Sequence, residues 1–496
     1  MRGSKLPPGP PGLPLLGNIL NFPKTEEWLV YKAISREYGS DIIQLRILGT
    51  SVIVLHDMKS VRDLMESRSS LYSDRPYSVM ICELMGWCNN VVFLPYGDFW
   101  RASRRIMHQE CKPLAVHNFH PGQIKATRQL LRRLLDSPDL WLEHLKQQVP
   151  FTARIQTAGA TLDTVYGIDI APKNDPYIDV IESALDGVVT AAMPGAFLVD
   201  IVSWLKYIPA WVPGADFQQK ANRWKKYQID SVHDTYNACK QDLAEGSAKS
   251  SYCSRLLAGL DPGRDNSAEE LIIRETAAVV YGGVWLTVSV LGTFFLAMVM
   301  HPELQAKAQA EIDAVMGPGR LPTFGDEDSL PYLSAVVKEC LRWQNVLPLG
   351  VAHRLMADDH YNGYFLSAGS IVVVNTWAIL HDENTYPDPF SFKPERFMKD
   401  GKLDPTVQDP ALAAFGYGRR ICPGRHMAIG NVWFTLASVL TAFNIAKAVD
   451  ANGRQITPSG RYITSLTSHV EPFKCAITPR SESVKGMILS MANETM

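Results

Sequence analysis

The stretch Phe415-Gly416-Tyr417-Gly418-Arg419-Arg420-Ile421-Cys422-Pro423-Gly424 carries the strongest signal in the chain. Glycines stand on both sides of the cysteine, so a tight loop can present its sulfur, and two arginines come shortly before it. Nearby positive charge lowers the pKa of a thiol, and the thiolate is the form that binds a metal. The continuation from His426 reads as the opening of a helix, whose N-terminal dipole would add to that stabilisation.

Two other interpretations of Cys422 rest on the same residues. A buried structural cysteine beside a glycine turn is the commoner outcome for a lone cysteine. A zinc site built on Cys422 and His426 lacks a second pair of ligands at a suitable spacing. The choice therefore depends on what accompanies this loop elsewhere in the chain.

The pattern Phe415-x-x-Gly418-x-Arg420-x-Cys422-x-Gly424 resembles the heme-binding loop of cytochrome P-450 proteins at every fixed position. The resemblance implies that Cys422 is the axial thiolate ligand of the iron in heme b (iron protoporphyrin IX). It also implies that Phe415, Gly418, Arg420 and Gly424 belong to the cofactor site. A thiolate ligand pushes electron density onto the iron and favours cleavage of the O–O bond.

Three companion motifs strengthen the resemblance. Glu339-Cys340-Leu341-Arg342 is similar to the family's Glu-x-x-Arg pair, whose spacing puts both charges on one helix face. Phe392-Lys393-Pro394-Glu395-Arg396-Phe397 resembles the later motif whose arginine, here Arg396, joins that ion network. Trp100-Arg101-Ala102-Ser103-Arg104 is similar to the element in which Trp100 and Arg104 reach a heme propionate.

The two carboxylates of heme need cations, and a guanidinium fork suits carboxylate pairing. The resemblance offers Arg104, Arg354 and Arg420 for this role, each at a matching motif position. Arg354 stands in the pair His353-Arg354 after Pro348.

Composition bounds the class of protein. The 496 residues are 46% hydrophobic and 20% charged, which excludes disordered, collagen-like and coiled-coil chains. Lys and Arg number 49 against 51 Asp and Glu, and a formal charge of −2 argues against nucleic acid as a partner. Eight cysteines without a Cys-x-x-Cys unit are too sparse for a disulfide scaffold, so we expect mostly reduced thiols.

Local patterns predict a mainly α protein with a small β part. Apolar residues at helical spacing predict helices over 303–315 and 332–344. Residues 42–48 with 51–55 read as a hairpin, and the valine run in 370–375 reads as a strand. The proline-rich stretch after His381 predicts a long ordered loop to about residue 410. The resemblance implies the cytochrome P-450 fold, with a long central helix over the heme.

One stretch could be mistaken for a membrane span. Thr276–Met300 is 25 residues without a charge, which satisfies the length criterion for a transmembrane helix. A long helix buried on all sides of a large domain has the same composition. The motifs on both sides of it favour the core helix.

Length alone suggests about three domains. The motifs run in family order without a linker-like break, so we expect one heme-thiolate domain over residues 19–496, after a proline-rich hinge over 1–18. The hinge is stiff and resembles the one that follows the membrane anchor in microsomal members. Either the preceding element is absent from this chain or the hinge packs on the body.

The resemblance is greatest to fungal microsomal members. It implies a place on the cytosolic face of the endoplasmic reticulum membrane, with this chain as the anchor-free soluble body. The segment Pro194–Pro213 contains many large apolar residues and two charges. It resembles the region that dips into the membrane and guards substrate entry, where tryptophans suit the interface.

The sequence departs from the family over the central helix. The usual pattern there is Ala/Gly-Gly-x-Asp/Glu-Thr-Thr, and the best register is Gly282-Gly283-Val284-Trp285-Leu286-Thr287. Trp285 then replaces the acid and Leu286 the alcohol of a pair that helps deliver protons, and neither side chain can relay a proton in that way. Shifting the register by one makes Thr287 the alcohol but puts Val284 at the glycine. Gly283, Trp285, Leu286 and Thr287 are the candidate catalytic positions.

Three functions remain open. The first is an ordinary heme-thiolate monooxygenase that oxidises a lipophilic small molecule, with water or substrate hydroxyls delivering protons. The second is a heme enzyme that uses peroxide, or that rearranges or dehydrates an activated substrate. The third is a heme-binding protein with little turnover.

The chain has no dinucleotide-binding or Walker loop. By resemblance, electrons come from NADPH through a separate flavoprotein reductase that docks near Arg419. An apolar pocket is expected from Met80, Leu84, Met85 and Trp87, with Val346–Leu349 opposite.

Overall fold

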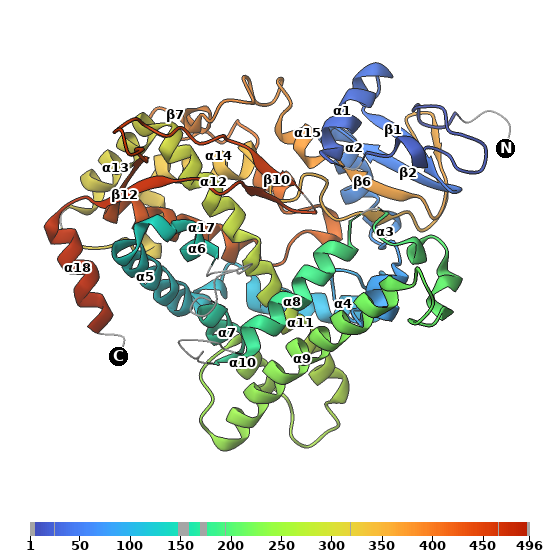
Figure 1. Cartoon of the computed structure of the whole chain (residues 1–496), viewed down its shortest axis with the longest axis horizontal. Coiled ribbons are helices and arrows are strands. Elements are labelled where there is room, and N and C mark those ends of the chain that lie inside the picture. Colours follow the sequence, from blue (N-terminus) through green and yellow to red (C-terminus); the bar gives the residue numbers. More distant parts are fainter. Residues whose placement is uncertain are drawn as a thin grey trace.

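The computed structural model describes residues 5–23, 25–146, 158–168, 176–193, 195–317, 319–464 and 466–493. Helices make up most of this structure, and the largest sheet lies toward the N-terminal end (Figure 1). The predicted class, mainly α with a small β part, is confirmed.

The central helix is one long rod with a single interruption. Helix α11 (Ser267–Trp285) ends one residue before α12 (Thr287–Met300) begins, and Leu286 between them is a turn. The Leu286 N–H donates to the Gly283 carbonyl at 3.3 Å, a tighter pattern than that of an α-helix.

The apolar stretch of this rod is buried in the molecule. By length and composition it could cross a membrane. However, 81% of its most apolar 18-residue segment is buried, and every residue of α12 up to Val299 is buried. The predicted core helix is therefore what the structure contains. It packs against α14 (Pro331–Trp343) and α17 (Arg425–Ala442), which share its largest apolar cluster.

The two helices predicted from periodicity are confirmed. The prediction over 303–315 corresponds to α13 (Pro302–Met316), and that over 332–344 corresponds to α14. Both begin with a proline at the first helical position, where a missing N–H leaves no hydrogen bond unmade. The other helices are α1 (Glu27–Glu37), α2 (Met58–Val61), α3 (Ser69–Tyr72), α4 (Asp98–Cys111), α5 (His120–Asp136), α6 (Trp141–Lys146), α7 (Ala158–Tyr166), α8 (Pro176–Ala191), α9 (Asp216–Glu245), α10 (Tyr252–Ala258), α15 (Thr376–Leu380), α16 (Ala411–Ala414) and α18 (Glu482–Asn493).

The predicted hairpin and strand join in one sheet. Its order is β1 (Ile42–Ile47), β2 (Thr50–Leu55), β6 (Ile371–Val374) and β3 (His353–Arg354), with β2 and β6 parallel and the other pairs antiparallel. The remaining strands form two-stranded pairs: β4 (Asp359–Tyr361) with β5 (Tyr364–Leu366), β7 (Met398–Lys399) with β8 (Lys402–Leu403), β9 (Phe443–Lys447) with β12 (Cys475–Pro479), and β10 (Tyr462–Thr464) with β11 (Ser468–Val470).

The proline-rich segment packs on the body, one of the two alternatives above. The Pro8 carbonyl accepts the Gln44 N–H of β1 at 2.9 Å, and Asn18 exchanges hydrogen bonds with the backbone of Arg46. A Cβ atom at Gly9 would lie 2.0 Å from the Gln44 carbonyl oxygen, so only glycine permits this approach. Residues 1–4 lie outside the described part of the chain.

Candidate functional site

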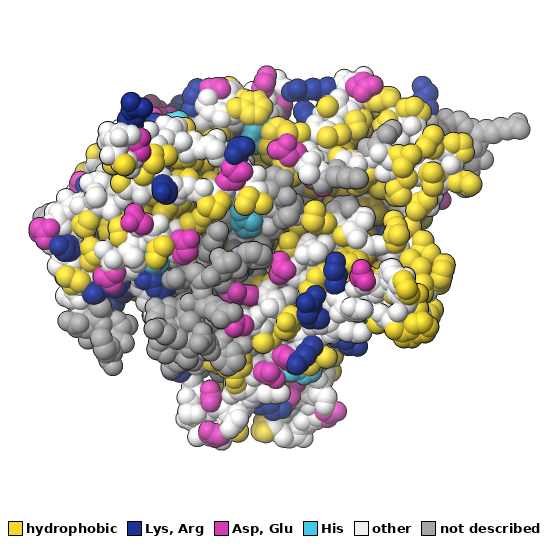
Figure 2. Space-filling model, viewed as in Figure 1, with side chains coloured by type: hydrophobic (Ala, Val, Ile, Leu, Met, Phe, Trp, Pro, Cys, Tyr) yellow, Lys and Arg dark blue, Asp and Glu magenta, His cyan; other side chains and the backbone are white. Residues whose placement is uncertain are grey.

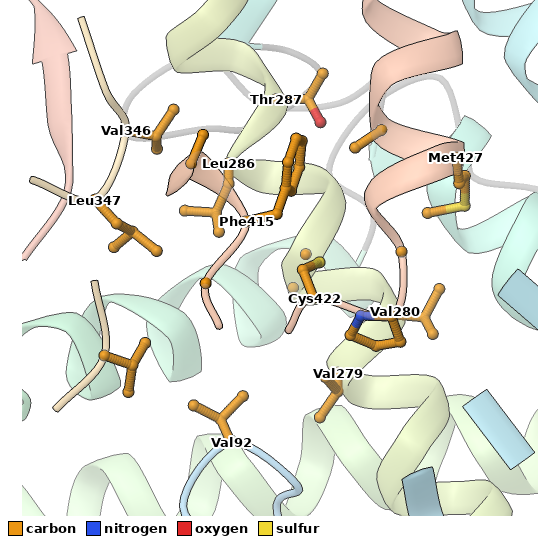
Figure 3. A pocket seen from close by; sticks show the side chains of 18 of the residues that line it. Val92, Val279, Val280, Leu286, Thr287, Val346, Leu347, Phe415, Cys422 and Met427 are labelled. Atoms are coloured by element: carbon orange, nitrogen blue, oxygen red, sulfur yellow. The ribbon is translucent and has the colours of Figure 1, made fainter. Parts of the chain in front are cut away.

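A cavity of about 450 Å³ lies between the central helix and the Cys422 loop. Its size is that of a small-molecule or cofactor site. Figure 3 shows side chains from both sides converging on it: Phe415, Cys422 and Met427 from the loop and α17, and Val279, Val280, Leu286 and Thr287 from the central helix.

The loop geometry presents Cys422 to this cavity. The Cys422 N–H donates to the Phe415 carbonyl at 2.7 Å, which closes the loop, and Gly416 takes a positive φ of 76° within it. Helix α17 begins at Arg425, close to the helix predicted from His426. Cys422, Phe415 and Gly424 all line the cavity.

Burial raises the pKa of the Cys422 thiol, contrary to the expectation from the loop sequence. The Gly424 N–H and the charges of Arg104 and Arg425 act in the opposite direction but do not outweigh the loss of solvent. Arg419 and Arg420, which the sequence suggested as the neighbouring charges, are not among the groups that act on the thiol. Arg419 turns instead to the Tyr96 hydroxyl.

Arg420 lines the cavity, but backbone carbonyls engage its guanidinium. The three nitrogens donate to the carbonyls of Ser73, Val91 and Leu94 at 2.7–3.1 Å. The group also lies over the Trp100 ring, 4.4 Å from its centroid. Arg420 therefore connects the Cys422 loop to the backbone at Ser73, Val91 and Leu94 through hydrogen bonds.

Gly418 itself does not line the cavity, although its neighbours in the loop do. It takes a positive φ of 54°, and a Cβ atom there would lie 1.9 Å from the Met65 carbonyl oxygen. The glycine is required because the loop crosses the π-helical turn η2 (Arg62–Ser67) at backbone contact.

Trp100 and Arg104 both face the cavity from α4. Trp100 is buried, and a guanidinium nitrogen of Arg104 donates to the Ile421 carbonyl beside Cys422. Burial lowers the pKa of Arg104 while the neighbouring Cys422 acts to raise it. Their contact with a heme propionate stays a prediction.

Arg354 is not among the residues that line the cavity. Its side chain is half-exposed and lies 3.5 Å from the Asp74 carboxylate. Adjacent residues of a strand point to opposite faces, and on β3 it is His353 that points inward and lines the cavity. The His353 Nδ1–H donates to the Tyr72 carbonyl at 2.7 Å.

Sequence reasoning missed Arg75. It lines the cavity, is buried, and donates to the carbonyls of Val92, Val351 and Ala352 at 2.7–3.1 Å. Burial and the nearby charge of Arg420 lower its pKa well below the usual value. A single arginine before a proline carries no local signal of this kind, because its partners come from distant segments.

The Glu339 carboxylate is the centre of a buried ion network behind the loop. Arg342 donates to both of its oxygens at 2.7 and 2.8 Å, and Arg396 donates at 3.2 Å. Glu339 and Arg342 are 0% exposed and Arg396 is 8% exposed. The Lys393 N–H also donates to Glu339 and fixes the loop that carries η9 (Pro394–Phe397) and the β7–β8 pair. That loop is the proline-rich one expected after His381.

On the opposite wall, Gly283, Leu286 and Thr287 line the cavity. A Cβ atom at Gly283 would have nothing within 4 Å, so this glycine leaves open space against the helix. Trp285 ends α11, and its side chain lies outside what the structure describes. Within the described residues, no hydrogen bond occupies the Thr287 hydroxyl.

The expected pocket is partly in place. Trp87, Val346, Leu347 and Leu349 line the cavity. Met80 and Met85 are instead buried in a separate apolar cluster, against which Leu84 packs. Their large side chains fill the space between α8, α9 and the loop that contains them.

The profile of the cytochrome P450 family matches residues 7–469. The chain belongs to the cytochrome P450 family. It is 45% identical to cytochrome P450 monooxygenase 98 of Postia placenta, over 98% of this chain and 93% of that protein. It is 43% identical to the tryptamine 4-monooxygenase of Psilocybe cyanescens (98% and 95%) and 40% identical to cytochrome P450 monooxygenase COX2 of Coprinopsis cinerea (98% and 91%).

Membership of the P450 family makes this chain a monooxygenase, and it implies a heme cofactor, an external electron donor and a lipophilic substrate. The residues of the cavity fit heme. One wall holds a cysteine, and the arginines Arg75, Arg104 and Arg420 of the same cavity could pair with the carboxylates of heme. Gly283 leaves the opposite wall open to a flat group.

Proposed function

We propose that this P450 oxidises a neutral, apolar small molecule, with Cys422 as the thiolate ligand of the heme iron. The observation that carries the proposal is the single cavity that joins Cys422 to an aliphatic wall on the central helix (Figure 3). When bound there, heme supplies the activation of dioxygen for transfer of one oxygen atom to the substrate. The protein supplies the ligand, the charges, the shape of the cavity and the protons.

Each part of the cavity wall has a task in this proposal. Arg104, with Trp100 beside it, would hold one carboxylate of the cofactor, and Arg75 and Arg420 would add positive charge for the other. Arg420 would act mainly through the loop that it holds in place. The buried network of Glu339, Arg342 and Arg396 would keep the Cys422 loop in register with α14.

The electron donor in this proposal is an NADPH-dependent flavoprotein reductase. Four exposed cations lie on α4, directly after it, or in the Cys422 loop: Arg101, Arg105, Lys112 and Arg419. Arg101 and Arg419 flank the Tyr96 ring, 5.4 and 5.3 Å from its centroid. Exposed cations of this kind attract an acidic partner, and the attraction weakens with salt.

Reconstitution tests the proposed function. The heme-loaded protein is combined with a fungal P450 reductase and NADPH and screened against apolar molecules by product analysis. We expect products that contain one atom from labelled dioxygen, and rates that fall as salt is added. Products formed with peroxide alone, and none with reductase, would instead establish the peroxide-using alternative.

Thr287 is the residue that we propose for proton delivery. Its hydroxyl lines the cavity, and a hydroxyl can accept one hydrogen bond while donating another. It can therefore hold a water molecule in the cavity and pass a proton through it. Leu286, which lines the cavity one position earlier, can do neither.

Removal of this hydroxyl is expected to uncouple the enzyme. Thr287→Ala should lower the product formed per NADPH consumed by about tenfold, since positioned proton donors contribute a hundredfold or more. Thr287→Ser keeps the hydroxyl and should keep the coupling. Both quantities are measured in one reconstituted assay. If Thr287→Ala forms as much product per NADPH as the unmodified protein, Thr287 is not part of the proton path. If Trp285→Asp/Leu286→Thr forms more product per NADPH than the unmodified protein, positions 285 and 286 have that role instead.

We also propose that this protein works at a membrane surface, in the endoplasmic reticulum. The segment between α8 and α9 exposes a set of large apolar side chains, here called the aromatic patch: Leu198, Trp204, Tyr207 and Trp211, all at least 64% exposed. Figure 2 shows apolar side chains gathered on the side of the molecule where this segment and the N-terminal residues lie. Tryptophan and tyrosine favour the membrane–water interface.

The aromatic patch is expected to determine vesicle binding. Trp204→Ser/Trp211→Ser should lower the fraction that floats with phosphatidylcholine vesicles at least about fivefold, because each indole contributes apolar area to the interface. Phe390→Ser is the control, since Phe390 is 63% exposed but lies outside the patch. An equal loss in both variants, or in neither, would contradict a specific role for the patch.

A further inference from the structure

The charged groups of the cavity are all of one sign. Apart from Cys422, every side chain that lines its described part and is charged at neutral pH is an arginine: Arg75, Arg104 and Arg420. His353 is kept neutral because burial and the charge of Arg75 lower its pKa well below the usual value. Asp74 does not line the cavity; it lies 3.5 Å from Arg354, and its charge also acts on Arg75 and Arg420.

Apart from the arginines, most of the cavity lining is apolar. Helix α8 contributes Leu185, Val188 and Val189, and the segments opposite contribute a further set of apolar side chains: Val92, Phe93, Val279, Leu286, Val346, Leu347 and Leu349. The polar lining residues are neutral ones, among them Asn90, Thr287 and Asn345.

This distribution discriminates between ligands by charge. A buried cation without a paired carboxylate loses its hydration and gains no ion pair in return. The described lining of this cavity holds three arginines and no carboxylate side chain, so an ammonium group finds no ion-pair partner there. A neutral ligand of the same shape meets neither penalty and gains the same apolar contacts.

We propose that this cavity selects neutral substrates and rejects those that carry an ammonium group, whatever their apolar skeleton. The inference rests on the proposed function, because it concerns the ligand of the same cavity. The relative from Psilocybe cyanescens is named for an amine substrate. Identity of 43% over nearly the whole chain therefore does not carry that substrate type to this protein.

The test uses pairs of ligands that differ in charge but not in shape. One pair is N,N,N-trimethyl-1-adamantylammonium with 1-tert-butyladamantane, and the other is octyltrimethylammonium with 2,2-dimethyldecane. A quaternary ammonium neither loses a proton nor coordinates a metal, so its affinity reports charge alone. Dissociation constants come from calorimetric titration of the heme-loaded protein at pH 8. We expect the neutral member to bind at least about 30-fold tighter.

A carboxylate placed in the aliphatic wall should reverse the preference. Leu185 lines the cavity beside the central helix, since a Cβ atom at Gly282 would lie 3.3 Å from its Cδ2 atom. Leu185→Asp is expected to reduce the neutral-to-cation ratio at least tenfold, because the carboxylate pairs with the ammonium. Leu185→Asn has nearly the same shape without the charge and should keep the ratio within about threefold.

The outcomes separate the two proposals. Equal affinities of the charged and neutral members in the unmodified protein would overturn the charge selection and leave the apolar-substrate function standing. An effect of Leu185→Asn equal to that of Leu185→Asp would also overturn it, since polarity rather than charge would then be the cause. If neither neutral molecule binds, the proposed apolar-substrate function fails and the charge selection fails with it.

Discussion

Replacing Cys422 with alanine is expected to abolish the thiolate signature of this protein. The reduced protein with carbon monoxide should lose the red-shifted absorption band that thiolate ligation produces, and turnover should fall by about a thousandfold or more, because the electron push of the sulfur is lost. The sulfur lies in an apolar surround in which burial alone raises the pKa of the thiol. A bound metal would favour the thiolate form of this sulfur.

Two companion variants make this result specific. Cys422→Ser keeps the size of the side chain but replaces the soft sulfur donor, and it should also lose the band. Cys88→Ala removes an exposed cysteine and should change neither the spectrum nor turnover. Persistence of the full band in Cys422→Ala would place the thiolate on another residue and overturn the ligand proposal.

Neutralising Glu339 is expected to cause the largest loss of stability of any single charge change in the described structure. Glu339→Gln leaves the guanidinium groups of Arg342 and Arg396 buried without a counter-charge. Removing one partner of a buried ion pair typically lowers the free energy of unfolding by about 3–5 kcal/mol. Here one carboxylate pairs with two arginines. Denaturant unfolding of the heme-loaded protein should show this loss, together with a lower heme content, since the network supports the loop that precedes Cys422.

An exposed pair with the same spacing provides the control. Glu482 and Lys485 of α18 are also three residues apart and 3.5 Å from each other, but both are solvent-exposed. Glu482→Gln should leave the free energy of unfolding unchanged within error. Adding Arg396→Met to Glu339→Gln should recover part of the stability, because one uncompensated charge fewer is buried. Equal stability of Glu339→Gln and the unmodified protein would show that the network has no structural role.

Patterns confined to a short stretch predicted much of this fold. Periodicity located α13 and α14 within one residue at each end, and β-branched runs located the β1–β2 hairpin and β6. The spacing of Glu339 and Arg342 places both charges on one turn of α14, and a helix enforces that geometry wherever it packs. The Cys422 loop is equally local, since its own backbone hydrogen bond from Cys422 to Phe415 closes it.

The direction in which a side chain faces could not be predicted from the sequence. His353 and Arg354 are neighbours on a strand, so one of them had to point inward, but the pairing of β3 with β6 decided which one. Gly418 is a glycine because of Met65, and Arg420 is engaged by carbonyls of Ser73, Val91 and Leu94. All of these partners are far away in sequence, and no spacing rule reports them.

Residues a few positions apart were enough to indicate the family, the helical class and the cysteine that the cavity presents. Packing was needed to show which arginines share the cavity, that burial raises the pKa of the Cys422 thiol, and that aliphatic side chains of the central helix line the same cavity. Burial and the distances between charges from distant segments set those properties, and both arise only when the chain has packed.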